Sequence, residues 1–124
     1  LFSTLLAVTC EAFVAGAKAG LPPETMTRVM GIETGKNAAS ARIIPEQVAT
    51  RKFKHGKLIA EACRELTLMS DEARRQGITI WIADKVRQLY GLAAQLGRPQ
   101  DDITRLITHY EKWAGVEVKA TATR

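Results

Sequence analysis

Apolar residues recur every three or four positions through most of the chain, a spacing that places them on one face of an α-helix. The pattern is clearest over 59–73 and again over 79–96. The first stripe consists of Ile59, Ala62, Cys63, Leu66, Met69 and Ala73. The second consists of Ile82, Val86, Leu89, Ala93 and Leu96. Gly77 and Gly97 follow these stripes, so the sequence predicts two helices that each end at a glycine.

Prolines and acidic residues indicate where two other helices begin. Pro22-Pro23-Glu24 suits a first helical turn, and Gly31 is expected to end that helix. Asp101-Asp102 opens the last helix, which Gly115 ends. The apolar face of this helix is predicted to comprise Ile103, Leu106, Ile107, Tyr110 and Trp113. Residues 116–124 are expected to form a flexible tail.

The segment 32–57 is less regular. A turn is expected at 34–37, a short helix over 38–44, and another short piece that begins at Pro45. No alternating strand pattern occurs before the tail. The sequence therefore predicts one all-α domain over 1–115, a bundle of about five main helices.

Residues 1–20 are apolar almost all round, which leaves three interpretations. A membrane span of about 20 residues would place Glu11 in the bilayer at a cost of about 2.5–3.5 kcal/mol. A signal peptide needs a basic start and an uncharged core, which this stretch lacks. We favour a long, largely buried helix that another domain or subunit helps to cover. Neither a capping residue nor an initiator Met precedes it, so we expect a fragment of a longer protein.

Composition changes this picture little. The 46% hydrophobic and 25% charged residues are typical of a globular domain, and 18 Lys+Arg against 13 Asp+Glu give a net charge of +5. Cys10 and Cys63 are too few for a disulfide scaffold and lie in apolar patterns. We expect both to be reduced core thiols in a cytoplasmic protein.

Candidate chemistry is sparse. The cysteines and histidines show no metal-ligand spacing, so no metal is expected, and His109 is interpreted as a partly exposed surface residue. The basic run 51–57 could attract phosphate or form a solvated loop, and no specific nucleic-acid binding is expected. Glu61 and Arg64 are spaced for a surface ion pair on a helix. The alternative is a functional role for the pair Arg64-Glu65.

Four groups of motifs follow one another in a particular order. They are LFSTLL (1–6) with AGLPPE (19–24), ETGKN (33–37), FKHG (53–56) with REL (64–66) and GIT (77–79), and YGLAA (90–94) with DDI (101–103). Together, over roughly 1–113, they resemble the C-terminal helical domain of the β-hydroxyacid dehydrogenases, the 3-hydroxyisobutyrate dehydrogenase family. The resemblance implies a fold similar to the C-terminal domain of 6-phosphogluconate dehydrogenase.

The same resemblance implies a function. A preceding Rossmann domain would bind NAD or NADP, while the helical domain closes the cleft over a small hydroxy acid and forms a homodimer. A Lys directly before Leu1 would act as general acid and base, and Thr4 stands where the family has an Asn that orients the substrate. Arg64 and Glu65 replace a Lys-Asp pair that lies beside the cofactor in the family. We therefore expect an NAD(P)-dependent cytoplasmic oxidoreductase without a membrane anchor, inactive as this fragment alone.

Departures from the family pattern leave an alternative open. Thr4 exchanges an amide for a hydroxyl, and Arg64 keeps a positive charge in a different geometry. Thr79 and Trp81 replace the usual prolines. These changes indicate an atypical subfamily or a copy that has lost the ordinary reaction. The alternative function is a non-enzymatic helical interaction and oligomerisation module, with residues 1–20 packing on a partner.

Overall fold

The computed structural model describes residues 1–32 and 34–122, so Glu33 of the second motif and the last two tail residues lie outside it. The helices are α1 (Phe2–Lys18), α2 (Pro23–Met30), the π-helix η1 (Ala39–Val48), α3 (Ile59–Arg75), α4 (Trp81–Leu96), the 3-10 helix η2 (Ile103–Arg105) and α5 (Leu106–Ala114). Within the described ranges no strand forms, and the single isolated bridge joins Leu58 to Asp102. The predicted all-α fold is confirmed.

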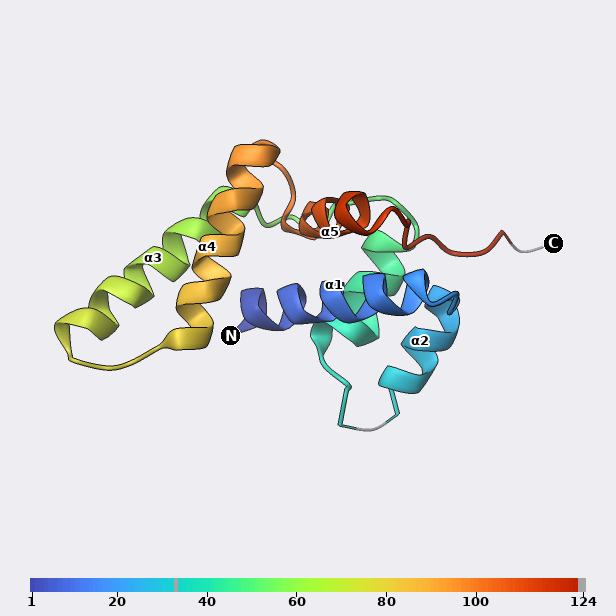
Figure 1. Cartoon of the computed structure of the whole chain (residues 1–124), viewed down its shortest axis with the longest axis horizontal. Helices are drawn as coiled ribbons and strands as arrows, with labels where there is room; N and C mark the ends of the chain where they lie inside the picture. Colours follow the sequence, from blue (N-terminus) through green and yellow to red (C-terminus); the bar gives the residue numbers. More distant parts are fainter. Residues whose placement is uncertain (33, 123–124) are drawn as a thin grey trace.

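The helices are arranged as a body with a projecting pair. In Figure 1, α1 lies alongside α5 and packs against η1, while α2 packs at the far end of α1. The helices α3 and α4 pack against each other and project from this body, and the N-terminus lies beside the start of α4. The first turn of α1 therefore faces the projecting pair.

Helix α1 supplies much of the core along one face. Leu6, Cys10 and Phe13 are fully buried, whereas Val8 is 54% exposed and Glu11 is also exposed. Burial of α1 within this chain is thus one-sided, and the other face is available to a further domain or subunit. No helix among the described residues has both the length and the apolar character needed to cross a membrane.

The segment around Pro45 forms one continuous helix, so the expectation of two short pieces is wrong. Pro45 lies inside η1, and beyond it the amide of Ala49 donates to the carbonyl of Ile44 at 2.8 Å. A proline has no N–H to give to the helical ladder, and here it lies in a wider π-helical turn instead of ending the helix.

The buried faces of α3 and α4 differ in part from the predicted stripes. Ile59, Ala62, Leu66, Val86 and Ala93 are buried as expected. Met69, Ile82 and Leu96 are respectively 41%, 73% and 56% exposed, and Cys63 is only half-buried. Tyr90, absent from the predicted stripe, is fully buried, and its hydroxyl donates to the carbonyl of Ser3 at 3.0 Å.

Part of the chain after α5, in the segment 116–121, contacts the body of the protein. Glu111 is buried. Its carboxylate forms an ion pair with the Arg51 guanidinium at 2.6 Å and accepts a hydrogen bond from the amide of Val118 at 2.8 Å. Val118 is fully buried, and the amide of Ala120 donates to the carbonyl of Ala49 at 2.9 Å. This ion pair holds the tail against the end of η1.

Candidate functional site

Thr4 lies one turn into α1, where the N-terminal end of this helix meets α4. The amide of Leu5 donates to the carbonyl of Leu1 at 3.0 Å, so the helix is formed from its first residue even without a side-chain cap. Thr4 is half-buried and contributes to the walls of two adjoining cavities between α1 and α4. Of the three site residues that the family resemblance implies, Thr4, Arg64 and Glu65, Thr4 is the one that lines these two cavities.

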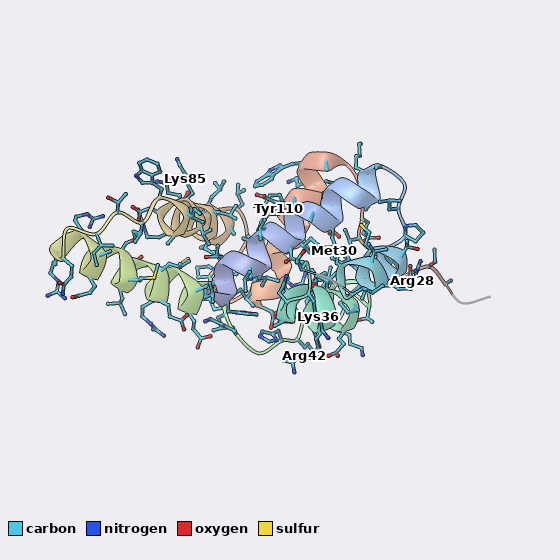
Figure 2. All side chains as sticks on the ribbon, turned by 90° about the horizontal axis from the view of Figure 1, so that it is seen from below. Arg28, Met30, Lys36, Arg42, Lys85 and Tyr110 are labelled. Atoms are coloured by element: carbon cyan, nitrogen blue, oxygen red, sulfur yellow. The ribbon has the colours of Figure 1, made fainter. Side chains whose placement is uncertain are left out.

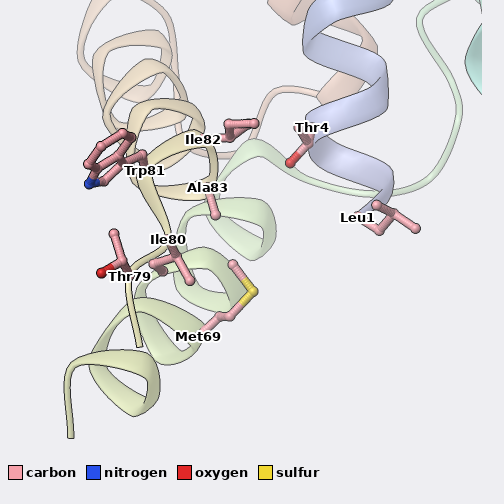
Figure 3. Close-up of a pocket in the computed structure, with 8 residues that line it drawn as sticks. All are labelled: Leu1, Thr4, Met69, Thr79, Ile80, Trp81, Ile82 and Ala83. Carbon is pink, nitrogen blue, oxygen red and sulfur yellow. The ribbon is translucent and has the colours of Figure 1, made fainter. Parts of the chain in front are cut away.

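The larger cavity, here called the apolar hollow, has a volume of about 650 Å³. Its walls come from the first turn of α1, from α3, and from the chain that leads into α4 (Figure 3). The lining residues are Leu1, Thr4, Met69, Thr79, Ile80, Trp81, Ile82 and Ala83. Figure 3 shows Leu1 and Thr4 on one side and Trp81, Ile82 and Ala83 on the other. The exposed apolar residues at the start of α4 thus form the wall of a cavity.

The second cavity, here called the polar groove, continues from Thr4 along α1 and α4 and has a volume of about 190 Å³. Glu11, Lys85 and Tyr110 contribute its polar groups, and Figure 2 shows Lys85 and Tyr110 on the same side of the molecule. The Tyr110 hydroxyl donates to a Glu11 carboxylate oxygen at 2.8 Å. Burial, together with this contact to Glu11, raises the pKa of Tyr110, so its hydroxyl keeps its proton at neutral pH. Charged groups therefore line the groove and not the hollow.

Arg64 and Glu65 lie on the exposed side of α3 and line neither cavity. Glu65 forms an ion pair with Lys57, a residue of the basic run. Since Glu65 and Met69 are four residues apart on α3, they share a helix face, which places this ion pair on the side of α3 that leads to the hollow. Arg64 has no ion-pair partner within residues 1–32 and 34–122.

The predicted surface pair between Glu61 and Arg64 does not form. A Glu61 carboxylate oxygen instead accepts the amide of Leu58 at 2.7 Å. A glutamate three residues after the N-cap position can satisfy an amide that has no partner within the helix. Glu61 therefore serves the start of α3, which leaves Arg64 directed at solvent.

The basic run 51–57 is partly used within the molecule. The guanidinium of Arg51 pairs with Glu111 and lies 4.6 Å from the ring centre of Phe53. The ring of His55 packs against Phe2, with 5.4 Å between the ring centres, and Lys57 pairs with Glu65. The run thus connects the first turn of α1 to α3, a role that periodicity does not reveal because the residues involved come from loops.

The remaining candidates for chemistry are embedded in the fold. Burial raises the pKa of the Cys10 thiol and of the Cys63 thiol, so both stay protonated at neutral pH. His109 is half-buried, and burial lowers its pKa. Among the described residues no group of three or more His, Cys, Asp or Glu side chains could hold a metal ion.

Comparisons with known proteins give a consistent result. Residues 1–110 match the family model described as NAD-binding of NADP-dependent 3-hydroxyisobutyrate dehydrogenase. The chain is 24% identical over 113 residues to 2-(hydroxymethyl)glutarate dehydrogenase of Eubacterium barkeri, an alignment that covers 91% of this chain and 38% of that relative. The chain thus spans less than two fifths of the length of this relative.

Two solved structures share the fold. The Mycobacterium tuberculosis 3-hydroxyisobutyrate dehydrogenase, solved with L-serine, superposes with a TM-score of 0.78 at 22% identity, covering 88% of this chain and 39% of that one. The 3-hydroxyisobutyrate dehydrogenase of Salmonella typhimurium gives a TM-score of 0.78 at 18% identity, covering 87% of this chain and 38% of that one. With the family match over 1–110, the chain belongs to the family of the helical, C-terminal domains of the 3-hydroxyisobutyrate dehydrogenases.

Proposed function

We propose that this chain is the helical domain of an NAD(P)-dependent oxidoreductase that acts on a small hydroxy acid. The observation that carries the proposal is the family match over 1–110, which includes the first turn of α1 and the whole apolar hollow. A Rossmann domain that precedes Leu1 in the same polypeptide would supply the dinucleotide site. The substrate cleft would lie where that domain meets the first turn of α1.

The first turn of α1 is suited to orient a hydroxyl-bearing substrate. A Lys directly before Leu1 would lie four residues from Thr4, and side chains at that spacing share one face of a helix. The Lys would take the proton of the substrate hydroxyl, while the Thr4 hydroxyl would hold the substrate by one hydrogen bond. The nicotinamide, when bound, supplies the hydride acceptor.

The surroundings of Arg64 fit a nicotinamide dinucleotide. Its guanidinium is exposed, and the neighbouring ion pair of Glu65 with Lys57 leaves Arg64 available to an anion. A guanidinium presents several N–H donors to phosphate, which suits the pyrophosphate or the additional phosphate of NADP. Arg64 and Glu65 are therefore proposed as cofactor contacts, without a preference between NAD and NADP.

Dimerisation through the exposed apolar surface is a further part of the proposal. Leu92 and Leu96 of α4 are 42% and 56% exposed, and Val8 of α1 adds to the apolar surface outside the core. A second copy of the protein that covered this surface would remove it from water. We also propose that the whole protein is cytoplasmic.

A non-enzymatic interaction module is the second candidate. The observation that favours it is Thr4, because a hydroxyl there replaces the amide that the family resemblance implies for orienting substrate. In that case the family fold would be retained for its apolar surface alone.

Determining the coding sequence upstream of Leu1 separates the two candidates. The dehydrogenase proposal expects a strand followed by a G-x-G-x-x-G turn and a Lys directly before Leu1. A Rossmann domain without that Lys would indicate a different or lost reaction. A start codon close to Leu1 would rule out the dehydrogenase and leave the interaction module.

A further inference from the structure

We infer that His55 and Tyr90 are positioning residues, which hold the first turn of α1 from two sides and so set the place of the Thr4 hydroxyl. This inference rests on the proposed function and adds two residues for which the family resemblance implies no role in the reaction. Neither residue lines the apolar hollow or the polar groove, so each would act on a substrate only through α1.

The hydroxyl of Tyr90 fixes the backbone of α1 directly beside Thr4. Tyr90 lies in α4 and is fully buried, and its hydroxyl donates to the carbonyl of Ser3 at 3.0 Å. In an α-helix such a carbonyl also accepts the amide four residues further on, so Tyr90 is a second donor to it. The carbonyl does not need Tyr90 in order to be satisfied. What the second hydrogen bond adds is a fixed distance between α4 and the residue before Thr4.

The ring of His55 packs on another side of the same turn. Its centre lies 5.4 Å from that of the Phe2 ring, and the two ring planes are tilted by 31°. Because each helical residue advances about 100° around the axis, the side chains of Phe2 and Thr4 leave the helix in directions about 160° apart. His55 therefore supports α1 from behind, on the face opposite Thr4.

The loop that carries His55 is anchored before the histidine. The buried ring of Phe53 lies between the guanidinium groups of Arg51 and Arg105, at 4.6 Å and 4.7 Å from the ring centre. Phe53 has a φ of 51°, a left-handed conformation that is unfavourable for a residue other than glycine. Such a conformation persists only where the surrounding contacts impose it, and it is typical of functional sites. The contacts of Phe53 thus hold the loop in an unfavourable shape.

The same loop is anchored again after the histidine. The amide of Gly56 donates to an Asp102 carboxylate oxygen at 2.8 Å, and the amide of Ile103 donates to the carbonyl of Lys57 at 2.7 Å. With anchors on both sides, His55 offers a fixed surface against which Phe2 packs. Together with Tyr90 it restricts both rotation and displacement of the first turn of α1.

A double-mutant cycle with Thr4 tests the inference in the full-length protein that contains this chain. The probe is the small hydroxy acid that the wild type oxidises fastest, starting from 3-hydroxypropanoate and its 2-methyl derivative. Tyr90→Phe removes only a hydroxyl and His55→Ala removes a ring, and each should lower kcat/KM about tenfold, because small displacements of reacting groups slow catalysis strongly. In a Thr4→Val background the same substitutions should lower kcat/KM by less than about threefold, since the group that they position is already absent.

His55→Phe is the conservative variant in this series. It keeps an aromatic ring against Phe2, so kcat/KM should stay within about threefold of the wild-type value. A merely structural loss would not depend on whether the Thr4 hydroxyl is present.

Hydrogen exchange gives a second readout that needs no reaction. The amide of Leu5 donates to the carbonyl of Leu1 at 3.0 Å, within the turn that His55 and Tyr90 contact. Its exchange should be about tenfold faster in Tyr90→Phe and in His55→Ala than in the wild type, the effect of one lost contact on local opening.

The matched control is Met26→Ala, because Met26 is buried in α2 at the far end of α1. This variant should lower the urea midpoint but leave kcat/KM and the exchange of the Leu5 amide within about twofold of the wild type. Equal losses of kcat/KM with and without the Thr4 hydroxyl, or unchanged kcat/KM in Tyr90→Phe and His55→Ala, would overturn the inference while the wild type stays active. If the wild type oxidises no small hydroxy acid with NAD or NADP, the proposed function itself fails.

Discussion

At the scale of single residues, the side chains that matter lie where loops meet helix ends. Thr4 borders both cavities, Glu61 accepts the amide of Leu58 just before α3, and Lys57 reaches Glu65 from the loop before that helix. The sequence marked Thr4 and Arg64-Glu65 through the family resemblance. It could not reveal Lys57, because an ion pair between a loop and a helix has no periodic signal.

The hydroxyl of Thr4 is expected to contribute to substrate orientation. Thr4→Val keeps the shape of the side chain and removes the hydroxyl, so kcat/KM should fall about tenfold, the value of one good hydrogen bond. Thr4→Ser, which keeps the hydroxyl, should stay within about threefold of the wild type. Steady-state kinetics of the full-length enzyme measure both, and equal losses in the two variants would contradict the role.

Asp84 is expected to make the stability of the α3–α4 pair depend on pH. The Ser70 hydroxyl donates to Asp84 at 2.6 Å and Arg87 lies beside it, so the pKa of this carboxyl is below its usual 3.8. A carboxyl whose pKa is lower in the folded state adds stability above the unfolded pKa, and that stability is lost as the pH falls through the folded value.

The urea midpoint should therefore drop below about pH 4, and the drop should be smaller in Asp84→Asn. Ser70→Ala, which removes the main donor, should reduce the drop in the same way. Urea unfolding from pH 5 to pH 2 measures it. A pH dependence in Asp84→Asn that equals that of the wild type would contradict this assignment.

At the scale of the elements, helix starts and ends were predictable because local chemistry sets them. Pro23 begins α2, and Gly115, with a φ of 64°, ends α5 in the left-handed conformation that glycine adopts easily. The π-helix around Pro45 was not predictable, since a proline in a short apolar stretch ordinarily indicates a helix start. The burial of Tyr90 was not predictable either, because its hydroxyl donates to the carbonyl of Ser3, which is far away in the sequence.

Two helical glycines should respond in opposite ways to an added methyl group. A Cβ on Gly16 of α1 would lie against the sulfur of the buried Met26, whereas a Cβ on Gly91 of α4 would meet nothing within 4 Å. Gly91→Ala should therefore stabilise the protein by about 0.5–1 kcal/mol through its effect on helix propensity. Gly16→Ala should destabilise it by about 1–3 kcal/mol through overpacking.

Urea unfolding at pH 7 measures both changes, and each variant is the control for the other. Replacing Met26 by Ala in the Gly16→Ala background should relieve the crowding and give a non-additive result. Stabilisation by Gly16→Ala alone would show that Met26 moves aside at no cost.

At the scale of the whole molecule, the division into a body and a projecting α3–α4 pair determines what is left uncovered. The body buries one face of α1, while α4 keeps exposed apolar residues at both ends, Trp81 and Ile82 at its start and Leu92 and Leu96 towards its end. Periodicity predicted Ile82 and Leu96 to be core residues. An apolar helix face has the same spacing whether it packs within the chain or is left for another domain or subunit to cover.

The surface around Leu92 and Leu96 is expected to carry the homodimer. Leu92→Glu would place a charge in an interface where it has no partner, so the variant should dissociate to monomers at concentrations where the wild type is a dimer. Val29→Glu, on the exposed side of α2, is the matched control and should remain dimeric. Sedimentation velocity over a concentration series measures this, and a wild type that is monomeric throughout would contradict it.

The central claim is that this helical domain serves an NAD(P)-dependent oxidation of a small hydroxy acid. Its most direct test measures the initial rate at which NADH or NADPH absorbance appears when the full-length protein is mixed with NAD or NADP and small 3-hydroxy acids. We expect reduction of one dinucleotide, and loss of that activity when the Lys expected before Leu1 is replaced by Ala. Absence of reduction with both dinucleotides and every hydroxy acid, in a protein shown to be folded, would contradict the claim.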